Sequence, residues 1–219
     1  MTGSAKALAL AVVVAGVLAA TPAFADHMVY RYRVDHHTYG DIGTYVNIVD
    51  RTGKDAKVET QLHVAVKLLG IVMFRQDATR IEYWHGDRLE SFHGVTVTNG
   101  RKLELTGRAR GDSFVLTTPS GTVVAPGNVH PTNPWSPMVL HSDEMMSTST
   151  GRLFHVAVTG GKETTVTLGG TTFRLRQFEI HSDKHEYVWL NDSGVTVAFR
   201  TEKDGTPIDF ILTRQVAGR

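Results

Sequence analysis

Apolar and polar positions alternate with a period of two along most of the chain after residue 26. In "MVYRYRV" (28–34), Tyr30, Tyr32 and Val34 fall on one side, whereas Arg31 and Arg33 fall on the other. A half-buried strand needs one apolar and one wet face, and successive side chains of a strand point to opposite faces. Further segments of this kind are 43–49, 56–70, 71–84, 88–100, 101–111, 113–118, 121–125, 153–160, 162–170, 171–182, 185–191, 194–202 and 207–214. The pattern predicts about a dozen strands and almost no helix.

Short turn sequences separate these segments. Asn99-Gly100 is the strongest hairpin signal, because both positions tolerate positive φ. Gly160-Gly161, Gly169-Gly170 and Asp204-Gly205 are further turn candidates between neighbouring strands. Strands joined by such short turns pair antiparallel, which predicts an all-β fold. A barrel or half-barrel is the favoured architecture, with a sandwich as the alternative.

One segment, 126–152, breaks the alternation. It contains four of the seven prolines and the tryptophan of "NPWSPM". We expect either a long ordered loop or a loop that encloses one short helix, Ser136 to Met146, and a helical insertion would cover one end of the sheet. Polar loops do not hold a tryptophan unless it docks, because the side chain buries of order 200 Å² of apolar area. Trp135 is therefore predicted to pack back onto the sheet, so that the insertion forms a lid or plug.

The stretch "EYWHGDRLESFHG" (82–94) is the richest in functional side chains. Gly86-Asp87 has the composition of a two-residue turn, which places His85 opposite Arg88 and Trp84 opposite Leu89. A hairpin tip with charged flanks is the favoured interpretation over a chemical site. Tyr83 and Trp84, together with Trp135, are the aromatic candidates for contact with a ligand or a lid.

The first 25 residues have the pattern of a secretory signal peptide. Lys6 precedes the apolar run "ALALAVVVAGVLAA", and "TPAFA" provides a small-x-small cleavage site before Asp26. The remaining 26–219 is expected to form a single β-rich domain, secreted or periplasmic. No second apolar run approaches the ~20 residues of a membrane span. The chain has no cysteine, and its 23 Lys and Arg against 22 Asp and Glu argue against a nucleic-acid binder.

Three stretches resemble a family of secreted bacterial proteins known as domain of unknown function DUF6134. These are "EYWHGDRLESFHGVTVTNG", "PTNPWSPMVLHSDEMMSTSTG" and the closing "YVWLNDSGVTVAFRTEKDGTPIDFILTR". The resemblance covers nearly all of residues 26–219, although its motifs are loose. It implies a secreted β-rich fold, similar to periplasmic lipid-carrier half-barrels, and it assigns no catalytic residue. This chain departs from the family pattern in its 11 histidines.

A histidine content this high favours metal or proton chemistry. His181 and His185 flank Ser182-Asp183-Lys184, so their imidazoles can meet across a hairpin and form a zinc or copper site with Asp183. In "HSDEMM", His141 and Met145 share a face if the segment is helical, and together with Asp143 they suit copper. The alternative interpretations are polar strand ends at a turn and methionine that fills the core. No cofactor is otherwise implied.

Three functions remain open on the sequence alone. The favoured one is a binding module for a small hydrophobic molecule or lipid, because "VAVKLLGIVMF" (64–74) is apolar on both faces, as a strand between a core and a cavity would be. The second is a metal-dependent or hydrolytic enzyme that uses rim histidines with Asp35 or Asp143. No Gly-x-Ser-x-Gly motif or triad spacing supports it, and no catalytic residue is assigned. The third is an assembly partner in the cell envelope.

Overall fold

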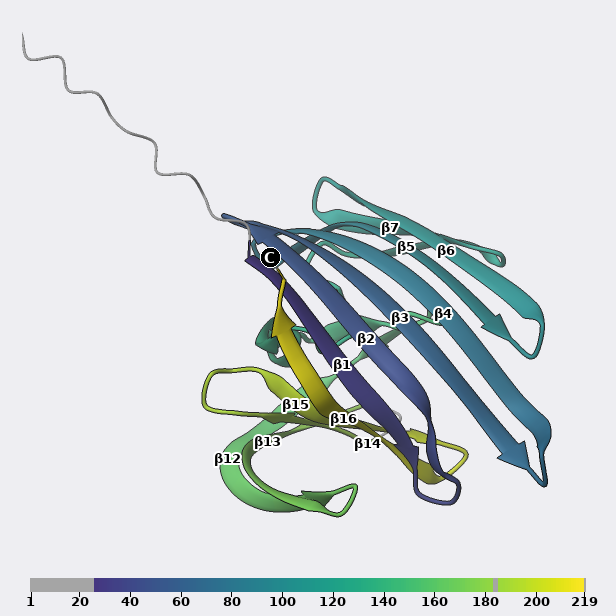
Figure 1. The fold of residues 1–219 in the computed structure, drawn as a ribbon. Coiled ribbons are helices and arrows are strands. Elements are labelled where there is room, and N and C mark those ends of the chain that lie inside the picture. Colours follow the sequence, from purple (N-terminus) through teal and green to yellow (C-terminus); the bar gives the residue numbers. More distant parts are fainter. Residues whose placement is uncertain (1–25, 183–184, 219) are drawn as a thin grey trace, which may run out of the picture.

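A computed structural model describes residues 26–182 and 185–218, and the predicted signal peptide (1–25) lies outside them. Thirteen strands form one antiparallel sheet in the order β12-β13-β14-β15-β16-β1-β2-β3-β4-β5-β6-β7-β8 (Figure 1). Their bounds are β1 Asp26–His36, β2 Gly40–Thr52, β3 Asp55–Leu68, β4 Ile71–His85, β5 Arg88–Thr98, β6 Arg101–Arg110, β7 Ser113–Thr118, β8 Gly121–Pro126, β12 Ala157–Leu168, β13 Thr171–His181, β14 His185–Leu190, β15 Thr196–Lys203 and β16 Thr206–Ala217.

The first and last strands pair with each other and join the two arms of the sheet. β1 pairs with β16 on one side and with β2 on the other. The arms end at β8 and β12, so the sheet curves without closing (Figure 1). The predicted all-β antiparallel fold is therefore confirmed in its barrel-like, open form.

The predicted hairpins have the expected registers. Trp84 pairs with Leu89 and His85 pairs with Arg88 around the Gly86-Asp87 turn. Asn99 (φ 48°) and Gly100 (φ 84°) connect β5 to β6 with two positive φ angles, as a type I′ turn requires. Gly160-Gly161 is an exception to the predicted turns, because it forms an irregularity inside the continuous strand β12.

The insertion, together with the adjoining residues 153–155, forms a small second sheet in the space enclosed by the curved main sheet. Its strands are β9 (His130–Pro131), β10 (Glu144–Met146) and β11 (Leu153–His155), in the order β11-β10-β9 (Figure 1). The predicted helix from Ser136 to Met146 is wrong. Only Pro137–His141 is helical, as the 3-10 turn η1, because Ser142 is extended and β10 pairs with strands on both sides.

Side chains from both arms pack on this insertion. Trp135, Val129 and Met146 join the cluster of Trp84 and Leu89 from β4 and β5. On the other arm, a cluster around Ile180 and Val188 includes three further insertion residues, Val139, Leu140 and Met145. The interior of the curved sheet is thus largely filled by protein.

The hairpin of β3 and β4 differs from the sequence-based interpretation. The apolar residues on both faces of 64–74 predict a strand between a core and a cavity. Val64 and Val66 are indeed buried, but the apolar residues from Leu68 to Met73 form an exposed hairpin tip. No helix among residues 26–182 and 185–218 is long and apolar enough to cross a membrane.

Candidate functional site

A row of buried polar side chains crosses the concave face of the sheet. Asn47 pairs in register with Thr60, Thr60 with Arg80, and Arg80 with Gly94, on the adjacent strands β2 to β5. Asn47, Thr60 and Arg80 are all buried. Alternation directs them inward with the apolar core residues, because they share the parity of neighbours such as Trp84. Each must therefore find its hydrogen bonds inside the protein.

The insertion meets this row through Asn133, which is itself buried. Its Oδ1 accepts hydrogen bonds from the hydroxyl of Tyr45 at 2.6 Å and from Nδ2 of Asn47 at 3.1 Å. Its Nδ2 lies 3.0 Å from Oγ1 of Thr60 and 3.0 Å from Oε1 of Glu82. One amide from the insertion therefore satisfies polar groups on three strands.

Glu82 is completely buried next to this amide. Its Oε2 accepts a hydrogen bond from the indole Nε1 of Trp84 at 3.0 Å, and its Oε1 accepts the one from Asn133. Burial raises the pKa of Glu82 from 4.5 to about 7, although these hydrogen bonds and the charge of Arg80 oppose the increase. This carboxyl therefore changes its charge near neutral pH.

Arg80 is the one cation of the row, with an exposed fraction of only 6%. Its Nε is buried without an acceptor, and no hydrogen bond or ion pair links its guanidinium to the part of the chain that the structure describes. Burial lowers its pKa, and Tyr45 and Glu82 act on it only through longer-range charge interactions that oppose this decrease. A buried arginine normally has several acceptors, because its desolvation is costly.

A cavity of about 160 Å³ adjoins Arg80 between the two arms of the sheet and the insertion. Its wall is mainly apolar, with Leu62, Val139, Met145, Ile180, Val188, Phe199 and Phe210. Polar groups come from Arg80, Tyr45, Thr132, Asn133, Thr148, Glu186, Tyr187, Arg200 and Thr201, and the Arg200 guanidinium is already paired with Asp209. Glu186 accepts a hydrogen bond from the Thr201 hydroxyl at 2.8 Å. The combination can enclose a small molecule with an apolar body and one negatively charged end.

A family model described as a domain of unknown function, DUF6134, matches residues 32–213. The chain belongs to the DUF6134 family. Among solved structures, this DUF6134 protein is similar to one titled a β-barrel-like protein of domain of unknown function DUF1849, from Brucella abortus. The TM-score is 0.63 and the identity 11%, over 88% of this chain and 98% of that chain, so the likeness concerns the fold alone. A comparison with curated proteins finds no match.

The aromatic candidates of the DUF6134 chain lie on two different faces. Trp135 is buried and packs edge-on against Trp84, with ring centroids 5.8 Å apart, so its predicted docking on the sheet is confirmed. Tyr83 follows the opposite parity and is exposed on the outer face. None of the three lines the cavity beside Arg80. Their contact with a ligand stays a prediction.

The predicted metal ligands fall into two groups. His141 is exposed at the end of η1, Asp143 accepts a hydrogen bond from Asn128, and Met145 is buried in β10. Since the segment is no continuous helix, the predicted i, i+4 pairing of His141 and Met145 does not form. His181 and His185, by contrast, face each other across β13 and β14, with ring centroids 5.3 Å apart. Asp183 lies outside the described residues.

Sequence reasoning missed the polar residues at the cavity. Arg80 and Glu82 share strand parity with the buried Trp84, and this parity is the available signal that two charged side chains point inward. Asn133 gave no comparable signal, because an asparagine before proline in an irregular segment is usually a turn residue. Its role depends on where the insertion docks.

Proposed function

We propose that this DUF6134 protein binds a small organic anion with an apolar body in the cavity beside Arg80. The observation that carries the proposal is the buried guanidinium, which lines a cavity and has no acceptor among the described residues. An anionic group placed there would make charge-assisted hydrogen bonds, which are about twice as strong as neutral ones. The apolar wall would hold the rest of the molecule.

The size of the cavity limits the ligand. Pockets for drug-sized ligands measure roughly 300–1,000 Å³, whereas a cavity of roughly 150 Å³ is known to hold benzene. At about 160 Å³, this cavity suits a ligand of roughly six to ten non-hydrogen atoms. The proposed class of ligands is therefore restricted from small hydrophobic molecules in general to compact carboxylates. A complete long-chain lipid is larger than this cavity.

The predicted signal peptide indicates the compartment in which the protein would meet its ligand. A protein exported to the periplasm or the medium would meet small carboxylates that enter the cell or leave it. Support for binding rather than turnover comes from the surroundings of Arg80, where Glu82 is already hydrogen-bonded by Asn133 and Trp84, and Glu186 by Thr201. The proposed role is therefore a binding protein.

Calorimetric titration with benzoate tests the proposal, with the uncharged benzamide as the matched ligand. We expect the mature protein to bind benzoate at least tenfold more tightly than benzamide, and Arg80→Met to abolish this preference. Arg75→Met is the control variant, because Arg75 lies on the same strand but is exposed on the outer face. Equal binding of the two ligands, or an unchanged preference in Arg80→Met, would contradict the proposal.

A further inference from the structure

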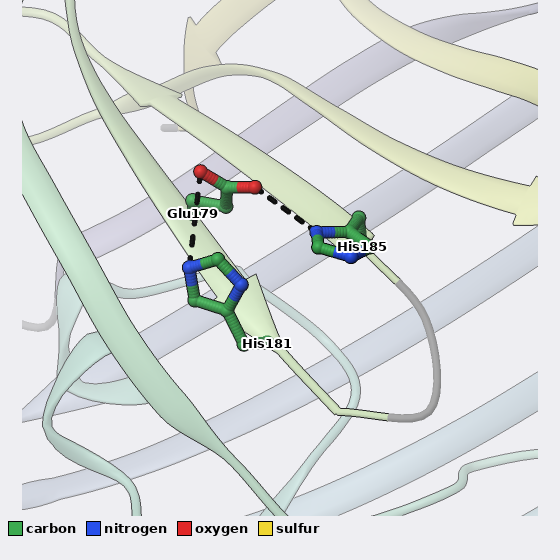
Figure 2. Close-up of side chains that lie close together, drawn as sticks. All are labelled: Glu179, His181 and His185. Atoms are coloured by element: carbon green, nitrogen blue, oxygen red, sulfur yellow. Dashed lines mark hydrogen bonds and ion pairs between the residues drawn. The ribbon is translucent and has the colours of Figure 1, made fainter.

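Three potential metal ligands share one face of the β13–β14 hairpin. Glu179 and His181 are two residues apart on β13, so alternation points both to the same face. His185 is the register partner of His181 on β14, which adds the second imidazole to that face. Figure 2 shows the Glu179 carboxylate between the two rings.

The distances suit a single cation. Nδ1 of His185 lies 3.1 Å from Oε1 of Glu179, and Nε2 of His181 lies 3.8 Å from Oε2. One ligand atom from each residue falls within 4.8 Å of the others. Bonds of about 2.0–2.2 Å in a tetrahedral site place the ligand atoms about 3.3–3.6 Å apart, so only small side-chain rotations are needed.

We propose that Glu179, His181 and His185 bind a divalent transition metal of the Zn²⁺ or Cu²⁺ class, with a fourth position open to water. Two imidazoles and one carboxylate are typical ligands for these ions, whereas Ca²⁺ and Mg²⁺ prefer oxygen ligands alone. The metal would compete with the Thr159 hydroxyl, which now lies 3.0 Å from Nε2 of His181.

Zinc titration of tag-free, chelator-stripped mature protein tests this site. We expect one Zn²⁺ per chain, and a loss of affinity of at least roughly tenfold in His185→Ala and in Glu179→Gln. His93→Ala is the matched control, because His93 pairs with the carboxylate of Glu104 at 3.0 Å across two strands but belongs to no cluster of three potential ligands in the described part of the chain. Cobalt substitution adds a visible spectrum that reports tetrahedral coordination.

The outcomes separate this site from scattered surface binding. An equal loss in His93→Ala, or stoichiometric zinc that persists in His185→Ala, would overturn the proposal, as would the absence of zinc binding. All three substituted side chains are at least partly exposed, so the variants should remain folded, which circular dichroism checks. Benzoate binding depends on Arg80 and should not change in these variants, so the two proposals fail independently.

A second observation concerns the tip of the β3–β4 hairpin, which extends far beyond the insertion at one end of the sheet (Figure 1). Five large apolar side chains of the tip are exposed, with fractions between 50% for Val72 and 95% for Leu69. They are Leu68, Leu69, Ile71, Val72 and Met73. A contiguous apolar patch on a soluble protein marks an interaction site.

Positive charges flank this apolar tip. Lys67 and Arg75 lie on either side of it in the sequence, with Arg75 paired to Asp77 at 2.7 Å, and Nζ of Lys203 lies 3.7 Å from the ring centroid of the adjoining Phe74. The other large exposed apolar side chains of the described chain, Tyr39, Tyr83, Val124 and Val216, do not form a second run of this kind. A second copy of this chain offers only the same tip, and pairing two tips would bring their Lys67 side chains, which carry the same charge, together.

We infer that the tip inserts into a lipid surface that carries anionic headgroups. The apolar side chains would enter the acyl boundary while Lys67, Arg75 and Lys203 meet the headgroups. Burial of apolar area together with attraction to anionic lipid determines the strength of such binding.

Flotation with vesicles tests the inference, using phosphatidylcholine with or without about one-third phosphatidylglycerol. We expect the mature protein to float with the anionic vesicles, and Leu69→Asp with Met73→Asp to reduce the bound fraction at least tenfold. Val124→Asp is the control, because it adds the same charge at an exposed apolar residue away from the tip. Absence of flotation, or an equal loss in Val124→Asp, would overturn the inference. So would a tip variant that altered self-association but not flotation.

Discussion

The Nδ2 amide of Asn133 lies 3.0 Å from Oε1 of Glu82 and donates a hydrogen bond to it. Asn133 belongs to the insertion and Glu82 to the centre of the sheet, 51 residues away in the sequence. Both are buried, so neither side chain can exchange this contact for water. The hydrogen bond therefore couples the position of the insertion to the polar row beneath it. Arg80 of this row lines the proposed binding cavity.

Asn133→Ala should destabilise the protein by about 2–4 kcal/mol. The change leaves the Tyr45 hydroxyl, the Asn47 amide and one Glu82 oxygen without their partner, and each unsatisfied buried group costs about 1–3 kcal/mol. Denaturant unfolding measures the loss, and limited proteolysis should show faster cleavage between residues 126 and 152. Asn128→Ala is the control, because the Asn128 side chain makes a single exposed hydrogen bond of 3.3 Å among the described residues. Equal stability of the two variants would contradict this coupling.

Trp135→Ala should cost about 3 kcal/mol of stability. The indole contacts Trp84 edge-on and has the Arg51 guanidinium 5.3 Å from its ring centroid, so its removal opens a hole in the apolar cluster under the insertion. Thermal and denaturant melting provide the measurement. Tyr83→Ala should change stability by no more than about 0.5 kcal/mol, since that ring is 48% exposed. A Trp135 variant as stable as the Tyr83 variant would show that the indole does not hold the insertion.

Local sequence patterns were sufficient to predict most strands of the sheet. Alternation and turn residues predicted the strands of residues 55–126 and the register around Gly86-Asp87, because these features depend on neighbours within a few residues. The pairing of β1 with β16 joins residues about 180 apart, so no turn sequence indicates it. The predicted helix after Ser136 failed for a similar reason, since β10 is held by strands that lie before and after it in the insertion.

The candidate sites also differ in whether they depend on neighbouring residues or on distant segments of the chain. The facing of His181 and His185 follows from a short loop and was predicted, whereas Glu179 joins them only through the parity of β13 and the observed register. The polar cavity required knowledge of what covers the concave face. Arg80 and Asn133 approach the same region from segments more than 50 residues apart, and the sequence does not state that they meet.

Glu82 should make stability depend on pH between about 4.5 and 7. Because its pKa is raised to about 7 in the folded protein, the folded chain holds a proton that the unfolded chain releases near 4.5. This contribution is fully present below about pH 4.5 and is lost as the pH rises through about 7, with a size on the order of 3 kcal/mol. Unfolding free energies at pH 5 and pH 8 should therefore differ less in Glu82→Gln than in the unmodified protein. The same difference in both proteins would contradict the raised pKa.

Arg80→Met should stabilise the ligand-free protein while it removes anion binding. The substitution replaces a buried cation without a described acceptor by an apolar chain of similar reach, and such replacements can gain about 1–3 kcal/mol. The gain should be largest near pH 5.5, where Glu82 is mostly protonated and uncharged. It should be smaller at pH 8, because Glu82 is then ionised and the substitution also removes its favourable charge interaction with Arg80.

Benzoate should narrow the stability difference between the two proteins if Arg80 is retained for a ligand. At ten times its dissociation constant, a ligand adds about 1.4 kcal/mol to the stability of the protein that binds it, and Arg80→Met should receive none of this. Unfolding free energies with and without benzoate, at both pH values, provide the comparison, with Arg75→Met as the exposed control from the same strand. If Arg80→Met is less stable than the unmodified protein even at pH 5.5 and without ligand, the guanidinium stabilises the ligand-free fold. An unpartnered cation would then no longer argue for an anion in the cavity.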